Sequence, residues 1–252
     1  MGDLLVARGV TKRFGAFWAV KRVDLTLPAG RLTSVIGPNG AGKTTLINLL
    51  SGLVKADEGS VEFRGRDITT LPIHERVRRG ISRSFQITSV FPRLSVHDNV
   101  LMPVLARLGE STHPVRRVRA DAPAALEATG LLERVGLRPQ ARQVAGALSH
   151  GDRRLLEIAM ALAPQPALCF LDEPCTGMNP SERQQILALI KRLAEGGATT
   201  FVVVEHDMDV VFAISEWIVV MNRGEVLVQG PPEDVRDDPA VREVYLGEEV
   251  AE

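Results

Sequence analysis

Residues 148–174 read LSHGDRRLLEIAMALAPQPALCFLDEP, and this stretch decides the fold. It begins with a small polar turn around Gly151, continues as an amphipathic helix, and ends in an apolar strand followed by Asp172 and Glu173. Paired carboxylates at the end of a buried strand are suited to holding a metal ion and positioning water. The Gly-containing helix start leaves backbone N–H groups exposed, which favours an anion. The stretch therefore predicts two phosphate-facing features in one chain.

A glycine-rich loop matching GxxxxGK[ST] occupies residues 37–44, within GPNGAGKTT. The apolar run at 31–36 precedes it and the helical run LINLLSGL follows it, which is the strand–loop–helix context of a P-loop. We expect Lys43 to bridge the β- and γ-phosphates, Thr44 to offer its hydroxyl to Mg²⁺ and Thr45 to contact the α-phosphate. Glycines let successive backbone N–H groups face the phosphates. The remaining residues of the predicted cradle are Gly37, Pro38, Asn39, Gly40, Ala41 and Gly42.

Apolar runs bounded by Gly, Pro and Asp predict an antiparallel strand layer, at residues 4–10, 23–27 and 60–63. Later strands alternate with helices, which predicts a parallel sheet with crossover helices. These strands are expected at 167–171, 200–204 and 217–220, and the helices at 181–193 and 208–214. A helical region is expected between them, with helices at 96–108, 115–129 and 153–163. One more strand at 224–230 and a helical tail at 232–246 complete the prediction.

The predicted fold class is therefore α/β: a P-loop NTPase core with a parallel sheet, an antiparallel β layer and an inserted α-helical subdomain. We expect one domain over residues 1–252. Within it, residues 1–87 and 164–252 would form the nucleotide-binding core with the β layer, and residues 88–163 the helical subdomain.

Composition limits the possible partners. The chain has 252 residues, of which 45% are hydrophobic, and its formal net charge is -1, so charge gives no reason to expect a nucleic-acid partner. Cys169 and Cys175 form no CxxC pair and are expected to be buried, reduced hydrophobes. No secretory signal is expected at the N-terminus, and no run reaches the roughly 20 apolar residues of a membrane span. We expect a chain that is soluble by itself, so that any link to a membrane comes through a partner.

Single polar residues near the strand ends extend the predicted site. Asp172 is expected to hold Mg²⁺, and Glu173 to act as general base or orient the attacking water, although Glu173 could instead cap the following turn. Gln86 follows an apolar and aromatic stretch and could reach Mg²⁺ and the attacking water. His206 follows a strand and could contact the γ-phosphate, or be structural. Ser149, three residues before an Asp, also fits a capping box whatever the function.

The ordered set GPNGAGKTT, Gln86, LSHGD, CFLDEP and His206 resembles the ATP-binding subunit of an ABC transporter over nearly the full chain. The resemblance implies that Phe14 stacks on adenine, with Phe17 and Trp18 as rivals. It implies two copies, or one copy and a paralogue, that meet around two ATP molecules. Ser149 and Gly151 would then contact the γ-phosphate held by the other copy. Gln86 would begin the loop that couples to transmembrane permease subunits.

Two departures from the family pattern stand out. The usual signature is LSGGQ, whereas His150 and Asp152 replace a Gly and the Gln here. The loop after the carboxylate pair reads CTGMNP where many relatives carry SALD, and Asn179 stands where an Asp is common.

The GMNP loop, the helical insertion around 105–124 and the tail EVYLGEE are similar to ATPases of branched-chain amino-acid importers. That subtype implies a substrate-binding protein as a further partner, and a peripheral position on the cytoplasmic face of the inner membrane. Urea or amide importers and lipopolysaccharide exporters are the transport alternatives. A soluble ABC ATPase of DNA repair or translation, or a regulatory nucleotide switch, would be a different class of protein.

Overall fold

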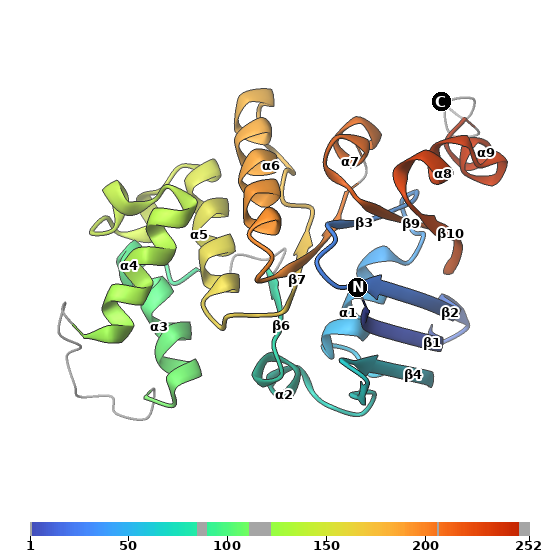
Figure 1. The fold of residues 1–252 in the computed structure, drawn as a ribbon, viewed down its shortest axis with the longest axis horizontal. Helices are drawn as coiled ribbons and strands as arrows, with labels where there is room; N and C mark the ends of the chain where they lie inside the picture. Colours follow the sequence, from blue (N-terminus) through green and yellow to red (C-terminus); the bar gives the residue numbers. More distant parts are fainter. Residues whose placement is uncertain (1, 85–89, 111–121, 206, 247–252) are drawn as a thin grey trace.

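Two β-sheets organise the chain (Figure 1). The computed structural model describes residues 2–84, 90–110, 122–205 and 207–246. Its four-stranded sheet has the order β2-β1-β4-β5, and its six-stranded sheet the order β10-β9-β3-β8-β7-β6. Figure 1 shows α3, α4 and α5 gathered on one side of the molecule and the four-stranded sheet on the other. None of the described helices is long and apolar enough to cross a bilayer.

The four-stranded sheet is the predicted antiparallel layer, with strands longer than predicted. They are β1 (Asp3–Phe14), β2 (Phe17–Pro28), β4 (Glu58–Phe63) and β5 (Arg66–Asp67). β1 pairs antiparallel with both β2 and β4, and β4 pairs with β5. The β1–β4 ladder is irregular beside Gly59, which has a φ of 88° and whose Cβ would lie 2.5 Å from the backbone of Gly9. Only glycine fits this close approach of two strands.

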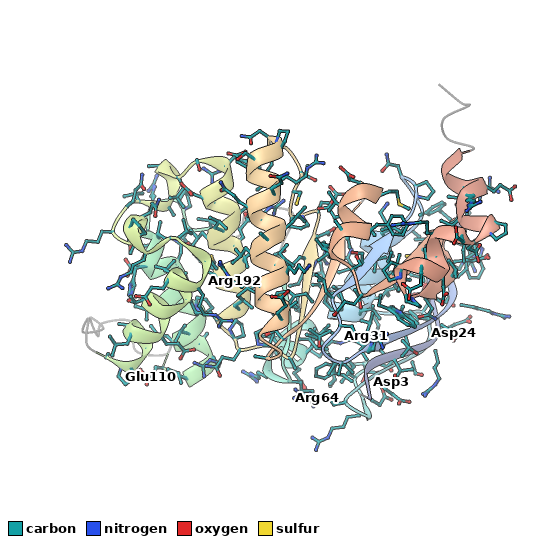
Figure 2. The ribbon with its side chains drawn as sticks, turned by 45° about the horizontal axis from the view of Figure 1, so that its top comes forward. Asp3, Asp24, Arg31, Arg64, Glu110 and Arg192 are labelled. Atoms are coloured by element: carbon teal, nitrogen blue, oxygen red, sulfur yellow. The ribbon has the colours of Figure 1, made fainter. Side chains whose placement is uncertain are left out.

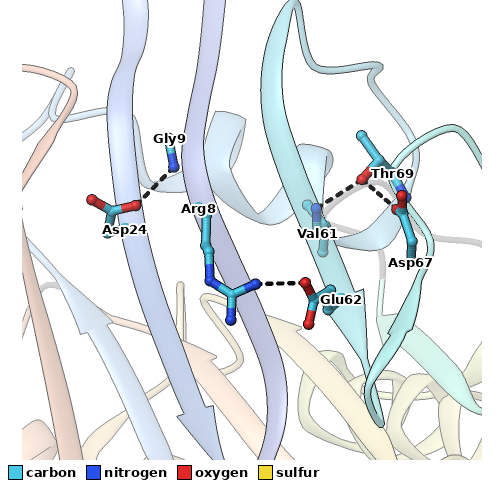
Figure 3. A network of polar contacts seen from close by, with 7 residues as sticks. All are labelled: Arg8, Gly9, Asp24, Val61, Glu62, Asp67 and Thr69. Atoms are coloured by element: carbon cyan, nitrogen blue, oxygen red, sulfur yellow. Dashed lines mark hydrogen bonds and ion pairs between the residues drawn. The ribbon is translucent and has the colours of Figure 1, made fainter.

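Polar contacts tie these strands together at their exposed side (Figure 3). The Gly9 N–H donates to Asp24 on β2 at 2.8 Å, and Arg8 forms an ion pair with Glu62 on β4 at 2.5 Å. Thr69 accepts from the Val61 N–H and donates to Asp67, linking β4 to the loop after β5. Exposed charges are spread over the other elements as well, as Arg31, Glu110 and Arg192 illustrate (Figure 2).

The six-stranded sheet carries the nucleotide-binding motifs. Five strands are parallel: β3 (Thr33–Ile36), β6 (Ile81–Ser84), β7 (Leu168–Asp172), β8 (Thr200–Val204) and β9 (Trp217–Asn222). The predicted last strand, β10 (Glu225–Gly230), pairs antiparallel with β9, so the sheet is mixed at this edge. Every residue of β3, β7 and β8 is buried, because both faces of the sheet are covered.

Nine helices lie in the part of the chain that the structure describes. They are α1 (Lys43–Ser51), α2 (Ile73–Arg78), α3 (Val96–Leu108), α4 (Pro123–Val135), α5 (His150–Leu162), α6 (Pro180–Glu195), α7 (Met208–Ile214), α8 (Pro232–Asp237) and α9 (Pro239–Leu246). Short 3₁₀ turns occur at Arg138–Gln140 and Ala145–Ala147. Gly52 ends α1 in the left-handed conformation, with a φ of 80°, as the sequence predicts.

Two helix predictions were wrong in their limits. The helix expected at 115–129 is α4, which begins at Pro123 and passes through Gly130 to Val135, while residues 111–121 lie outside the described part of the chain. The helical tail is two helices, because Asp238 precedes a proline and adopts an extended conformation with a ψ of 125°.

The strand residues of β7 and β8 alternate between two apolar clusters. On β7, Leu168 and Phe170 pack with α1 and the antiparallel layer. Cys169 and Leu171 face the other way, into a cluster with α3, α4, α5 and α6. The helical region therefore shares its core with one face of the sheet. The two cysteines are free and buried as predicted, and burial raises the pKa of each thiol to about 12.

Candidate nucleotide site

The glycine-rich loop joins β3 to α1 in a conformation that only glycine allows at two positions. Gly37 has a φ of 146° and its Cβ would lie 2.1 Å from the Met221 carbonyl oxygen. Gly42, the N-cap of α1, has a φ of 100° and its Cβ would lie 2.3 Å from the carbonyl oxygen of Ala19. β9 and β2 thus press against the two ends of the loop. This contact holds the loop as a backbone cradle at a helix N-terminus, where an anion is favoured.

Lys43 is the first residue of α1, and its ammonium folds back over the loop. Its Nζ donates to the carbonyl oxygens of Gly37 at 2.6 Å and Pro38 at 3.0 Å. The side chain is thereby held at the mouth of the cradle, where a phosphate would meet it. Thr44 is exposed in the first helical turn, and Thr45 is partly buried beside it.

Asp172 is the last residue of β7 and is fully buried. Its Oδ2 accepts a hydrogen bond from the Arg83 guanidinium on β6 at 2.6 Å. Its Oδ1 has no hydrogen-bond partner among the described residues. A buried carboxylate oxygen without a partner is costly, and such an oxygen is a preferred ligand of a hard cation such as Mg²⁺.

Glu173 follows with a left-handed backbone, at a φ of 45°, which is unusual for a residue with a side chain. Three contacts fix it there: its N–H donates to the Val204 carbonyl at 3.0 Å, its carbonyl accepts from Arg154 at 2.9 Å, and its carboxylate accepts from Thr176 Oγ1 at 3.0 Å. Strained backbone that the surroundings enforce in this way clusters at active sites.

The Ser149–Asp152 turn begins α5 as the sequence predicts. Ser149 is the N-cap, and its Oγ accepts from the Asp152 N–H at 3.1 Å. His150 lies against the loop after Glu173, since a Cβ at Gly177 would be 3.7 Å from its Cε1 atom. This turn is not beside the P-loop along the sheet: α5 packs at the β6–β7 edge, whereas the P-loop follows β3, with β8 between.

The three aromatic candidates for stacking lie together at the β1–β2 hairpin. Phe14 and Phe17 face each other across its tip, with 52% and 62% of their surfaces exposed. Trp18 is 40% exposed, and the Arg13 guanidinium lies 4.5 Å from its ring centroid. The hairpin leads directly to Ala19, which contacts the P-loop at Gly42.

Two predicted residues, Gln86 and His206, lie outside the described part of the chain. Conversely, sequence reasoning did not single out Arg83 and Arg154, which contact Asp172 and Glu173. Arg154 also pairs with Glu157 at 2.7 Å, and burial raises the pKa of the Glu157 carboxyl. Neither arginine could be marked as a site residue by local spacing, because its contact with the carboxylate pair, Arg83 with Asp172 and Arg154 with Glu173, joins residues distant in sequence.

A glycine cradle after one parallel strand and a carboxylate pair after another are the arrangement of a P-loop ATPase, and this is the class that the fold and site define.

Comparison with known proteins narrows the class. The ABC transporter family model matches residues 20–176, and a model described as branched-chain amino acid ATP-binding cassette transporter matches residues 225–251. The high-affinity branched-chain amino acid transport ATP-binding protein LivG of Salmonella typhimurium is 40% identical, over 97% of this chain and 98% of the relative. BraF of Pseudomonas aeruginosa, which has the same description, is 39% identical over the same shares.

Solved structures that resemble this chain are ATP-binding cassettes of ABC transporters as well. The ADP conformation of MJ1267, an ATP-binding cassette of an ABC transporter, superposes with a TM-score of 0.87 at 32% identity, covering 98% of this chain and all of that one. A dimeric structure of MJ0796, a bacterial ABC transporter cassette, gives a TM-score of 0.78 at 27% identity and covers 91% of this chain and 99% of its own. The chain belongs to the ABC transporter family and is its ATP-binding, ATP-hydrolysing cassette.

Proposed function

We propose that this chain is the ATPase subunit of a membrane importer for branched-chain or related amino acids. The observation that carries the ATPase is that the P-loop after β3 and the carboxylate pair after β7 follow parallel strands of one sheet. The substrate class is supported by the descriptions of LivG and BraF and by the family match of the tail at 225–251.

Mg²⁺ fits this site because Asp172 Oδ1 is a buried oxygen without a partner among the described residues. Thr44 and Asp172 would hold the ion, which supplies charge neutralisation at the phosphates when bound. Lys43 would move its donors from the loop carbonyls to the β- and γ-phosphates. Its ammonium needs little displacement, because it already lies over the Gly37 end of the cradle.

Glu173 would orient the attacking water and accept its proton. The Glu173 carboxylate accepts from Thr176 Oγ1, a hydroxyl that can yield to water. Gln86 would help to position Mg²⁺ and the water, and His206 would contact the γ-phosphate. Phe14 would stack on the adenine ring.

The ATP site would be completed by a second cassette, either an identical copy or a paralogue. Ser149 and Gly151 belong to a helix start at the β6–β7 edge, two strands from β3, so they are suited to a phosphate held by another molecule. We propose that residues 88–163 carry this helix start as a subdomain that moves relative to the core of residues 1–87 and 164–252.

The proposed complex includes transmembrane permease subunits and a substrate-binding protein, with this chain on the cytoplasmic face of the inner membrane. Urea or amide import and lipopolysaccharide export are the alternatives that use the same ATPase chemistry.

The test is to reconstitute the chain with the permease subunits and binding protein encoded beside it, and to measure phosphate release. Leucine-loaded binding protein is expected to stimulate hydrolysis. Glu173→Gln is expected to lower hydrolysis by about 10²–10⁴-fold, the usual contribution of a general base, while ATP still binds. Glu195→Gln removes an exposed carboxylate at the end of α6 and should leave the rate unchanged.

Normal turnover in Glu173→Gln would overturn the assignment of the base. Stimulation by urea or lipopolysaccharide in place of leucine would assign the chain to one of the other transport systems.

A further inference from the structure

The guanidinium of Arg83 joins the proposed cation ligand to the helix that carries the P-loop lysine. Nη2 donates to Asp172 Oδ2 at 2.6 Å, and Nη1 donates to Asn48 Oδ1 on α1. The Arg83 side chain is 5% exposed and that of Asp172 is fully buried. Three elements, β6, β7 and α1, therefore meet at one planar group.

The geometry fixes which oxygen of Asp172 can bind a cation. Arg83 engages Oδ2, so Oδ1 is the oxygen left without a partner among the described residues. The other terminal nitrogen of the guanidinium, Nη1, links this carboxylate to α1 through Asn48, which lies four residues after Thr44. One side chain thus orients the carboxylate and ties it to the helix that begins with Lys43 and Thr44.

Charge supports the same role. A buried carboxylate that has lost its cationic partner is strongly disfavoured. A guanidinium presents two parallel donors in a rigid plane, which a lysine ammonium cannot reproduce. Outer partners of metal-binding carboxylates generally fix the orientation of the ligand and raise the affinity of the site.

We propose that Arg83 is a positioning residue for the divalent-cation site: it holds the Asp172 carboxylate turned so that Oδ1 faces the cation. This inference rests on the proposed role of Asp172 in holding Mg²⁺. If the guanidinium instead competed with the cation for the same carboxylate, loss of Arg83 would raise the cation affinity rather than lower it.

The experiment measures Mn²⁺ affinity by electron paramagnetic resonance in the full-length chain saturated with a non-hydrolysable ATP analogue. Arg83→Met is expected to weaken Mn²⁺ binding about 10–100-fold, as loss of an outer partner does in other metal sites. Arg79→Met, which removes an exposed arginine at the end of α2, should leave the affinity unchanged. Affinity for a fluorescent ATP analogue in the presence of EDTA should stay the same in all variants, which separates the cation from the P-loop.

Unchanged or tighter Mn²⁺ binding in Arg83→Met would overturn the proposal. If that variant does not fold, Arg83→Lys is the deciding variant, because it keeps the charge but cannot contact Asn48 and Asp172 together. A several-fold loss of Mn²⁺ affinity in Arg83→Lys supports the proposal, and wild-type affinity overturns it. Asp172→Asn tests the proposed function separately. If it leaves Mn²⁺ affinity unchanged, Asp172 is not a cation ligand and the proposed function fails first.

Discussion

Arg76 shows how a buried charge outside the nucleotide site holds the fold together. Its side chain is almost fully buried, and it donates to the carbonyls of Leu49 and Leu50 at the end of α1, each at 2.8 Å. It also donates to the carbonyls of Thr69 and Leu71 at 3.0 Å. Burial lowers the pKa of this guanidinium to about 10, which still leaves it charged at neutral pH. The last carbonyls of a helix lack their usual partner within it; Arg76 supplies one to Leu50 and a second to Leu49, which also accepts from the Gly52 N–H at 3.2 Å.

We expect Arg76→Met to lower the free energy of unfolding by at least about 3 kcal/mol, because each buried acceptor left unpaired costs about 1–3 kcal/mol. Urea unfolding followed by circular dichroism measures the change. Arg79→Met is the matched control, an exposed arginine three positions on, and should change stability by less than about 0.5 kcal/mol. Equal unfolding midpoints for the two variants would show that Arg76 has no structural role.

Some parts of the site could be predicted from local spacing in the sequence, and others could not. Lys43 and Thr44 belong to the GxxxxGK[ST] motif, which spans only eight residues, so local spacing in the sequence identifies them. Arg83 and Asp172 are 89 positions apart, and the pair exists only because β6 and β7 are neighbours in the sheet. Nothing in the sequence around Arg83 distinguishes it from a solvated arginine. Sequence reasoning therefore named the proposed ligands and missed the groups that contact them.

At the scale of elements, α6 begins with a complete capping box just after the loop that follows Glu173. Asn179 Oδ1 accepts from the Glu182 N–H at 3.0 Å, and the Glu182 carboxylate accepts from the Asn179 N–H at 3.2 Å. Both donors would otherwise lack a partner at the helix start. The asparagine that departs from the family pattern thus performs the capping role that an aspartate would.

We expect Asn179→Ala to destabilise the protein by about 1 kcal/mol, the usual cost of losing an N-cap side chain. Asn179→Asp keeps the acceptor and adds a charge that the helix dipole favours, so its stability should equal or slightly exceed that of the wild type. Thermal unfolding at constant protein concentration compares the two. A loss as large in the aspartate variant as in the alanine variant would mean that the cap is not what position 179 contributes.

Periodicity predicted the long elements well and the short ones poorly. The helix at 96–108 and the strand at 200–204 match α3 and β8 to the residue, since each has a full apolar face. α2 was not predicted from the sequence, because its six residues are rich in charge and show no apolar stripe. The buried residue of this helix is Arg76. The helix was expected to end at Thr129, but α4 continues through Gly130, because its packing against α3 and α5 outweighs the modest cost of a glycine.

At the scale of the whole molecule, the arrangement of the sheet separates the two halves of an ATP site. The P-loop follows β3, and the Ser149 turn begins α5 beside β6 and β7. Figure 1 shows α5 and α1 on opposite sides of β6 and β7. We propose that the molecule uses both features on one ATP by pairing head to tail with another cassette, so that each copy gives its P-loop to one site and its α5 turn to the other.

Mixing two inactive variants tests this pairing directly. Lys43→Ala removes the P-loop ammonium, and Gly151→Arg blocks the helix start. Gly151 has no positive φ, and its nearest neighbour is the flexible end of the Glu182 side chain, so the arginine can be accommodated. In a mixed dimer one site combines both defects, and the other site is intact. Random pairing makes half of the dimers mixed, so an equimolar mixture should recover about a quarter of the wild-type ATPase rate if the two sites act independently. A site built within one chain would recover nothing, because every copy carries a defect, and that result would refute the composite site.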